Sequence, residues 1–324
     1  MNIFAITKTF RGHEFALASL QSIYPFISGV LYIHEDIGWM GRKGNTVRDV
    51  IKQAPDPDHK IYHLDLHGQI SQDDQYNAAV EWLETNKVKY DFLLLVDTDE
   101  IWTDEDYDRV EFELEFLLKY QYKNPNNSIR CRQYDYVKSP FFRVDPPGRY
   151  RQTNFVLKRA VKKGALNLRG CYIKPGKELD TVFWHHFPMV RTTLTEVVGK
   201  QVDSCGIEKV PIVNMENWVK TVWNVLPDAF NLCPLADVPG YWAGIKVVGI
   251  GDLPKTIQNH PIVLAWQKYP KDRYPHHNTA KVTPEILKKH GLPLDFGPRH
   301  PDWKTPSKRN CFDQAIKELM GAKK

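Results

Sequence analysis

The sequence is poor in cysteine and has no long apolar run. Its five cysteines, at positions 131, 171, 205, 233 and 311, are odd in number, widely spaced and never arranged as CxxC. This pattern argues against a disulfide framework and against a zinc–cysteine site, and it favours a reducing compartment. The longest clean apolar run, Phe92–Val96, is far shorter than the roughly 18 residues that a membrane span needs.

The first residues also lack the apolar core of a secretion signal. The segment MNIFAITKTFRGHE reaches Lys8 and Arg11 early, so no signal peptide is expected. With 42% hydrophobic and 26% charged residues, the 324-residue chain has the composition of a folded globular protein. We therefore predict a cytoplasmic protein without a membrane span.

Positive charge is in excess and unevenly distributed. The 44 lysines and arginines exceed the 39 acidic residues by five. Residues 255–324 hold 14 basic against 6 acidic residues, and residues 143–177 hold 10 basic residues against the single acid Asp145. Such surpluses suit the phosphates of a nucleotide or nucleic acid, or an anionic glycan, and the alternative is an ordinary solvated surface.

Strand and helix patterns alternate over the first hundred residues. Short apolar segments predict strands, and amphipathic or well-capped segments predict helices between them. The expected strands are 2–7, 29–33, 61–66 and 92–96, and the expected helices are 14–24, 46–54 and 72–86. This order predicts an α/β fold with an open, mostly parallel sheet.

The pattern becomes mixed after Asp108. A helix is expected over 110–120, strands over 128–137, 153–160, 168–173 and 181–187, and helices over 193–205, 215–226 and 313–320. We interpret residues 1–108 as a nucleotide-binding half and 109–265 as the mixed half of the same catalytic domain. A basic extension rich in Pro and Trp follows over 266–324.

Two carboxylates follow the most apolar strand. Asp97 and Asp99 stand at the carboxyl end of the run 92–96, where ligands bind in open α/β sheets. Carboxylate oxygens are hard ligands suited to Mg²⁺ or Mn²⁺. Three further Asp-x-Asp pairs, at 56–58, 104–106 and 106–108, occur in polar surroundings and are interpreted as structural. The strand context therefore singles out 97 and 99, and Asp99→Ala is expected to abolish activity while sparing the fold.

Adjacent histidines further along the chain offer a third ligand. His185 and His186 belong to the segment TVFWHHFPMVR. Since neighbouring residues of a strand point to opposite faces, at most one of them faces a given site. A neutral imidazole can complete a coordination sphere begun by two carboxylates, and a purely structural histidine is the alternative.

The segments LLLVDTDE and HHFPMVR, about ninety residues apart, resemble those of GT-A glycosyltransferases, most closely the family 2-like members. The resemblance covers about residues 1–205. It implies the nucleotide-diphospho-sugar transferase fold and a metal-dependent transfer of a sugar from a nucleotide sugar, with a UDP-sugar expected, to a hydroxyl acceptor. It also implies a Mn²⁺ or Mg²⁺ ion held by Asp97, Asp99 and one of the two histidines, with His186 favoured over His185.

The same resemblance implies a donor site. The end of the first strand would border the nucleotide, and the acid after the second strand would contact the base, with Asp36 favoured and Glu35 as its rival. Arg191 would pair with a phosphate or form a structural ion pair, and Gln75 and Asn77 would flank the donor or be plain helix surface. The implied donor residues are Thr7, Lys8, Thr9, Arg11, Glu35, Asp36, Gln75, Asn77, Asp97, Thr98 and Arg191.

The acceptor side is less defined. An inverting enzyme needs a carboxylate that deprotonates the acceptor hydroxyl, and the candidates are Asp135, Glu178 and Asp180. A retaining enzyme needs none. The usual acidic or tryptophan-containing acceptor motif is replaced by YDYVKSP at 134–140. The acceptor therefore stays open among a glycan, a protein, a lipid-linked sugar and a nucleic acid.

Three alternative functions follow from the same residues. A DNA-modifying glycosyltransferase acting on a hydroxylated base would use the basic stretches 143–177 and 255–324, which are interleaved with aromatic residues. A nucleotidyltransferase is disfavoured because TKTFRGHEFA contains a single glycine and no phosphate-binding loop. A non-catalytic module that binds a nucleotide sugar or glycan would share the fold.

Overall fold

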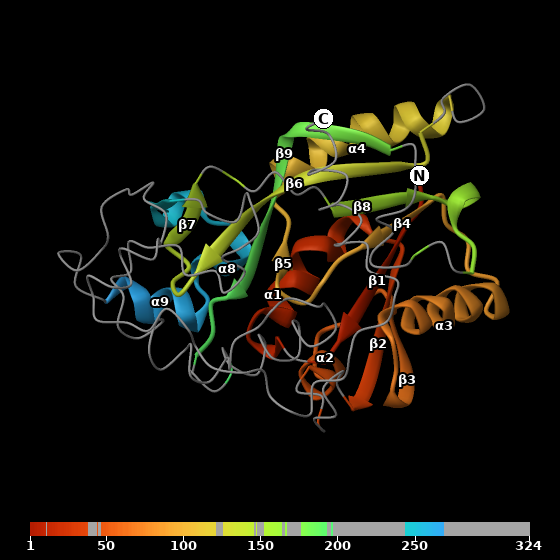
Figure 1. Ribbon diagram of the computed structural model, residues 1–324, viewed down its shortest axis with the longest axis horizontal. Coiled ribbons are helices and arrows are strands. Elements are labelled where there is room, and N and C mark those ends of the chain that lie inside the picture. Colours follow the sequence, from red (N-terminus) through yellow and green to blue (C-terminus); the bar gives the residue numbers. More distant parts are fainter. Residues whose placement is uncertain are drawn as a thin grey trace, which may run out of the picture.

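The fold is described from a computed structural model of the chain (Figure 1). The residues described are 1–10, 12–37, 44, 47–120, 126–145, 147, 152–163, 166, 176–192, 196 and 244–268. The expected strand 168–173 and the expected helices 215–226 and 313–320 lie outside these ranges, as does the helix 193–205 apart from Glu196. Most of the predicted extension 266–324 also lies outside them.

The N-terminal half forms a parallel sheet with helical crossovers. Its elements are β1 (Ile3–Thr9), α1 (His13–Ile23), β2 (Gly29–Ile37), α2 (Arg48–Lys52), β3 (Ile61–Gln69), α3 (Gln72–Thr85) and β4 (Phe92–Leu95). The strands lie in the order β3-β2-β1-β4, and all three pairings are parallel. The carboxyl ends of these strands therefore meet at one edge of the sheet.

The C-terminal half continues the sheet with mixed directions. Its elements are β5 (Glu100–Ile101), α4 (Asp104–Lys119), β6 (Ser128–Val137), β7 (Phe142–Asp145), β8 (Gln152–Leu157), β9 (Gly176–Met189), β10 (Gly244–Val247), α8 (Lys255–Gln258) and α9 (Pro261–Gln267). The order continues β4-β8-β6-β7-β10 through antiparallel pairs, while β9 pairs parallel with β6 and antiparallel with β5. The predicted α/β class, with a mixed C-terminal half, is confirmed.

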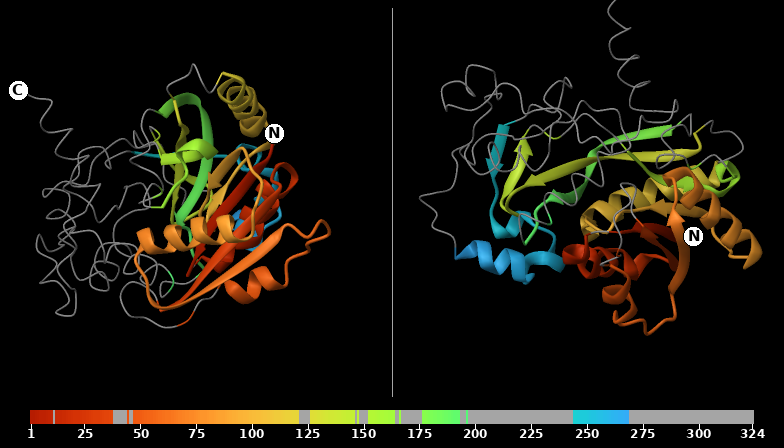
Figure 2. Two further views of the ribbon diagram at one scale, coloured as in Figure 1. Left: turned by 90° about the vertical axis from the view of Figure 1, so that its right-hand side faces the viewer. Right: turned by 60° about the horizontal axis from the view of Figure 1, so that its bottom comes forward.

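Both faces of the central strands are buried, as the continuous apolar run predicts. On β4, Phe92 and Leu94 pack with α1, α2 and α4, whereas Leu93 and Leu95 pack with α3 on the other face. Figure 2 shows α3 and α1 on opposite sides of the sheet. Each fully buried leucine or phenylalanine contributes about 2 kcal/mol, which holds the strand that carries the acidic motif inside the sheet.

Helix α4 begins at Asp104, earlier than the expected start at residue 110. The Thr103 hydroxyl accepts a hydrogen bond from the N–H of Asp106 at 3.1 Å and so caps the helix. Three acids in the first turn complement the helix dipole. The Asp-x-Asp pairs 104–106 and 106–108 thus belong to a capped helix start, in agreement with their structural interpretation.

A histidine pair links β2 and β3, with His34 buried and His63 exposed. Nε2 of His34 is 2.9 Å from Nδ1 of His63, and Nδ1 of His34 is 2.7 Å from the Thr9 hydroxyl, which donates to the Ile33 carbonyl. Because the hydroxyl proton is used there, His34 donates from Nδ1, and its Nε2 accepts from His63. Burial, assisted by His63, lowers the pKa of His34 from 6.5 to about 4.

This lowered pKa predicts destabilisation in acid. Between pH 6.5 and 4 the unfolded chain binds a proton at His34 that the folded chain does not, so the free energy of unfolding falls as pH decreases. The full effect is about 3 kcal/mol. Urea denaturation at pH 7 and pH 5 should show this fall, and His34→Asn should flatten it in part, since burial likewise lowers the pKa of His185 to about 3. A pH dependence that His34→Asn leaves unchanged would contradict this origin.

Candidate metal and donor site

The acidic motif forms a tight turn after β4. The carboxylate of Glu100 accepts the N–H of Asp97 at 2.9 Å, and the N–H of Glu100 donates to the Asp97 carbonyl at 3.1 Å. Ser19 of α1 also donates to that carbonyl at 3.2 Å. Glu100 is fully buried, so its carboxylate holds the turn that presents Asp97 and Asp99.

His186 lies beside Asp99 because β5 pairs with β9 at these positions. Its Nε2 is 3.8 Å from Oδ1 of Asp99, and its Nδ1 is 2.8 Å from Oδ1 of Asp135 on β6. Gln133 donates to both oxygens of Asp135, at 3.0 and 2.9 Å. When neutral His186 donates a hydrogen bond from Nδ1 to Asp135, its Nε2 carries the lone pair, which lies on the side of Asp99.

This arrangement fits a divalent cation between Asp99 and His186. A metal about 2.1 Å from each ligand atom can span up to about 4.2 Å, which accommodates the 3.8 Å separation. A carboxylate behind the imidazole is the usual outer partner of a metal-binding histidine. Burial by itself lowers the pKa of His186, but the hydrogen bond to Asp135 and the charges of Asp99, Asp135 and Glu100 raise it overall. A metal must therefore compete with a proton there.

Asp97 lies further from this pair. Its side chain is 28% exposed, and Oδ1 is 3.9 Å from Nζ of Lys8. Among the described residues, the group of three whose ligand atoms all lie within 4.8 Å of one another is His13, Glu14 and Glu196, not the predicted set. Asp99 and His186 are thus brought together, while Asp97 stands at the more open edge with Lys8.

His185 points away from Asp99. Its Nδ1 is 2.8 Å from the hydroxyl of Tyr136, and the two rings stack. Burial, assisted by Arg143, lowers the pKa of His185 to about 3, so the ring is neutral. The adjacent histidines thus occupy opposite faces of β9, as strand alternation requires.

The predicted donor residues of the first strand divide into buried and accessible groups. Thr7 and Thr9 are buried, and Thr9 serves the His34 pair. Lys8 lies over the ring of Tyr76 at 5.1 Å and near Asp97, which places a cation beside the motif. Arg11 lies outside the described residues.

The two acids after β2 differ in accessibility. Glu35 is buried and accepts a hydrogen bond of 2.6 Å from the buried amide of Gln75, whose helix also carries Asn77. Asp36 is exposed and accepts the N–H of Gly68 at 2.8 Å, which lowers its pKa. Asp36 is therefore the acid that a ligand can reach from solvent.

Arg191 is buried between two carboxylates. Its Nη2 is 2.6 Å from Oδ2 of Asp99, and its Nη1 is 3.8 Å from Oε2 of Glu14. All three side chains are at most 3% exposed. Arg191 thus lies behind Asp99. Its contacts fit the second of the two roles expected for it, a structural ion pair. Glu14 does not stand out in the sequence, because an acid in the first turn of a helix is already explained by the helix dipole.

The candidate bases do not gather at the motif. Glu178 and Asp180 are exposed, and Glu178 pairs with Arg130, five positions before Asp135 on β6, which is about 17 Å along the strand. Asp180 follows Leu179, the partner of Cys131. Their nearness to the histidines in sequence is therefore lost in the extended strand. Asp135 is close to the motif, but its carboxylate is engaged by His186 and Gln133.

Two residues of the basic stretch 143–177, Lys158 and Arg159, lie far from the acidic motif. The N–H of Lys158 donates to the Asp91 carbonyl at 2.9 Å, and Arg159 donates to the side chain of Asn127 at 2.9 Å. Both lie at the amino end of β4, opposite the acidic motif. The guanidinium of Arg143 lies 4.0 Å over the ring of Tyr134. Arg151 lies outside the described residues.

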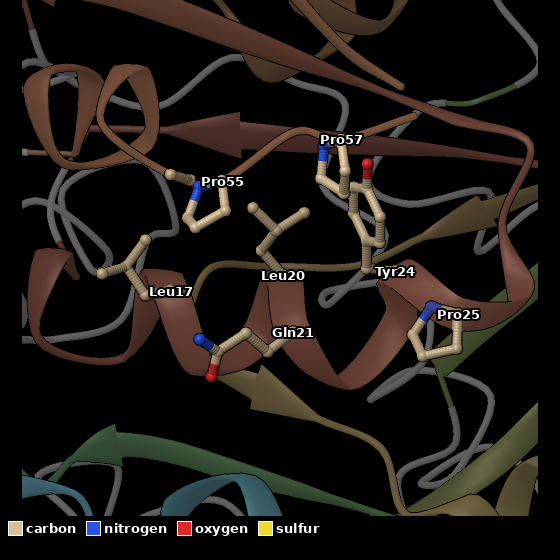
Figure 3. A pocket seen from close by; sticks show the side chains of 8 residues that line it. Leu17, Leu20, Gln21, Tyr24, Pro25, Pro55 and Pro57 are labelled. Atoms are coloured by element: carbon tan, nitrogen blue, oxygen red, sulfur yellow. The ribbon is translucent and has the colours of Figure 1, made fainter. Parts of the chain in front are cut away.

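A shallow apolar pocket of about 260 Å³ lies on α1 (Figure 3). It is lined by Leu17, Leu20, Gln21, Tyr24, Pro25, Ala54, Pro55 and Pro57. The face of α1 that carries Ser19 and Ser22 instead contacts the acidic turn and Trp102. No predicted site residue lines this pocket, so the polar strand edge remains the candidate site.

No protein-family model matches the chain, and no curated protein matches its sequence. Among solved structures, it is similar to residues 1–349 of TarS from S. aureus at 8% identity, over 69% of this chain and 71% of that chain, with a TM-score of 0.37. It is similar to A197 from STIV at 14% identity, over 58% and 86%, with a TM-score of 0.31.

A third similar structure is the mannose-1-phosphate geranyltransferase of Thermus thermophilus. The identity is 13% and the TM-score 0.28, and the alignment covers 53% of this chain and about half, 54%, of that chain.

Proposed function

We propose that the protein is a metal-dependent glycosyltransferase that moves a sugar from a nucleotide sugar, with a UDP-sugar expected, to a hydroxyl acceptor. The observation that carries the proposal is the Asp99–His186–Asp135 arrangement at the carboxyl end of β4. A carboxylate oxygen and an imidazole nitrogen converge there with a spacing that suits one divalent cation. The resemblance of LLLVDTDE and HHFPMVR to GT-A segments supports the same function.

Each residue would have a distinct part in donor binding. Asp99 and His186 would hold Mn²⁺ or Mg²⁺, and the carboxylate of Asp97 would approach from the open edge. When bound, the ion would stabilise the negative charge that develops on the departing diphosphate. Lys8 adds a cation beside Asp97 for a phosphate oxygen, and exposed Asp36 offers acceptors for a base.

The same proposal covers the cellular location of the enzyme and the class of its acceptor. No helix in the described ranges is long and apolar enough to cross a membrane. We propose a cytoplasmic enzyme whose acceptor is a glycan, protein, lipid-linked sugar or nucleic acid. We also propose that the chain is divided into the segments 1–108, 109–265 and 266–324.

Release of nucleoside diphosphate from a panel of nucleotide sugars tests this function. We expect one nucleotide family to be turned over with Mn²⁺, and EDTA to stop the release. His186→Ala should raise the Mn²⁺ concentration needed by at least about tenfold, whereas His185→Ala should leave it unchanged. Equal or reversed effects of the two variants would move the ligand to the other face of β9.

Other outcomes would support the alternatives. Donor binding without turnover for any acceptor would indicate a binding module. Release of pyrophosphate from a nucleoside triphosphate and a sugar phosphate would indicate a nucleotidyltransferase. DNA binding that weakens steeply with salt would support a DNA acceptor, and no DNA binding at low salt would exclude it.

A further inference from the structure

A buried chain of charges connects α1 to the candidate metal ligands. Arg191 lies between Glu14 and Asp99, with ion-pair distances of 3.8 Å and 2.6 Å. Two carboxylates share one guanidinium, so the buried trio carries one net negative charge when both acids are ionised. Buried charges need compensation, and His186, 3.8 Å from Asp99, is a further group on that side that can supply it.

The two ends of this trio are bound differently. Arg191 makes a charge-assisted hydrogen bond to Asp99 but only a longer ion pair to Glu14. Both oxygens of Glu14 are buried, and neither has a hydrogen-bond partner among the residues that the structure describes. Another nearby titratable group is His13, whose Nδ1 lies 3.7 Å from Oε2 of Glu14. Glu14 therefore has acceptor capacity directed toward the guanidinium.

A cation at Asp99 would compete with Arg191 for the same carboxylate. A bound ion would be partly neutralised by the carboxylate of Asp99, which would then compensate the charge of Arg191 less well. The guanidinium would need a second carboxylate nearby. Glu14 is that anion, since it already lies on the far side of Arg191 and can accept its N–H groups. Without the charge of Glu14, Arg191 would neutralise Asp99 alone and oppose the ion.

We propose that Glu14 is a positioning residue, which acts through Arg191 to keep Asp99 available to a divalent cation. This inference rests on the proposed metal-dependent function and extends it to a residue on α1. It assigns Glu14 no contact with substrate. It also gives a role to the buried carboxylate of Glu14 at the start of α1.

Binding of Mn²⁺ to the whole protein, measured by calorimetry, tests the inference. Glu14→Gln should weaken Mn²⁺ binding about ten- to a hundredfold, the usual effect of an outer-shell partner. Glu14→Asp, which keeps the charge, should restore most of the affinity. The stoichiometry should stay at one, and turnover at saturating Mn²⁺ should stay close to that of the unmodified protein.

Two controls separate this role from others. In EDTA, Glu14→Gln should unfold within a few degrees of the unmodified protein; a large loss of stability together with unchanged Mn²⁺ affinity would show a merely structural role and overturn the inference. His13→Ala should leave the affinity unchanged. If Glu14→Gln, His13→Ala and Glu196→Gln each remove one bound Mn²⁺ equivalent, that cluster is itself a metal site and the inference is wrong.

The failure of the proposed function has a different signature. An unmodified protein that turns over nucleotide sugars but binds no Mn²⁺ would overturn both the metal role and this inference. An unmodified protein that binds Mn²⁺ with the Glu14 dependence above but transfers no sugar would support the inference and contradict the transferase.

Discussion

Asp99→Asn should lower metal-dependent transfer by at least about a thousandfold, because about 4 kcal/mol of transition-state stabilisation depends on the ion that Asp99 would hold. The variant should also be less stable. The substitution removes the charge that accepts the 2.6 Å hydrogen bond from buried Arg191, although Glu14 still faces the guanidinium at 3.8 Å. Loss of a hydrogen bond between charged groups costs about 1.5–3 kcal/mol. Initial rates with a nucleotide sugar and urea denaturation measure the two effects.

The matched control for stability is Asp97→Asn. Asp97 is partly exposed and 3.9 Å from Lys8, so its replacement should change the free energy of unfolding by at most about 1 kcal/mol. A folded Asp99→Asn protein that keeps Mn²⁺-dependent activity would contradict the metal role. The sequence-based expectation that Asp99 could be replaced without cost to the fold assumed an exposed carboxylate. That assumption is wrong, because Asp99 is fully buried and paired with Arg191.

Gly12→Ala should reduce transfer about a hundredfold through displacement of the acidic turn. Gly12 has φ of +116°, and a Cβ atom there would lie 2.6 Å from Oγ1 of Thr98. The backbone conformation costs an L-residue roughly 1–3 kcal/mol. The buried side chain of Thr98 must also shift, and we expect its neighbours Asp97 and Asp99 to shift with it. A shift of about 1 Å in a catalytic group can cost about a hundredfold in rate.

Gly251→Ala is the control, because its Cβ would meet no atom within 4 Å and its φ is ordinary. It should leave activity and stability unchanged. Adding Thr98→Ala to Gly12→Ala should recover part of the activity, since it removes the atom that the new Cβ meets. Full activity of Gly12→Ala alone would show that the turn tolerates displacement and would contradict its role in placing Asp99.

The fold could be predicted because local signals and packing agree. The run Phe92–Val96 is apolar at every position, and the structure buries it on both faces. Ser71 caps α3 where the sequence predicts a helix start. The predicted start of α4 is too late because local signals there disagree. The polar first turn after Thr103 lacks the apolar periodicity that marks the rest of the helix.

The candidate site was only partly predictable. Asp99 and His186 stand out from strand context and alternation, which are local properties. The position of Arg191 behind Asp99 depends on how β9 and α1 pack, and no spacing in the sequence encodes it. Asp180 is close to the histidines in sequence but not in space for a related reason. Residues that are close in sequence separate rapidly along an extended strand.

The most direct test of the central claim is thermal stability with nucleoside diphosphates in the presence of Mn²⁺ or EDTA. A ligand at about 100 times its Kd adds about 2.7 kcal/mol of stability. We predict a higher melting temperature with one nucleoside diphosphate and Mn²⁺, lost in EDTA and lost in Asp99→Asn. No stabilisation by any nucleotide, with or without Mn²⁺, would contradict a donor site at this strand edge.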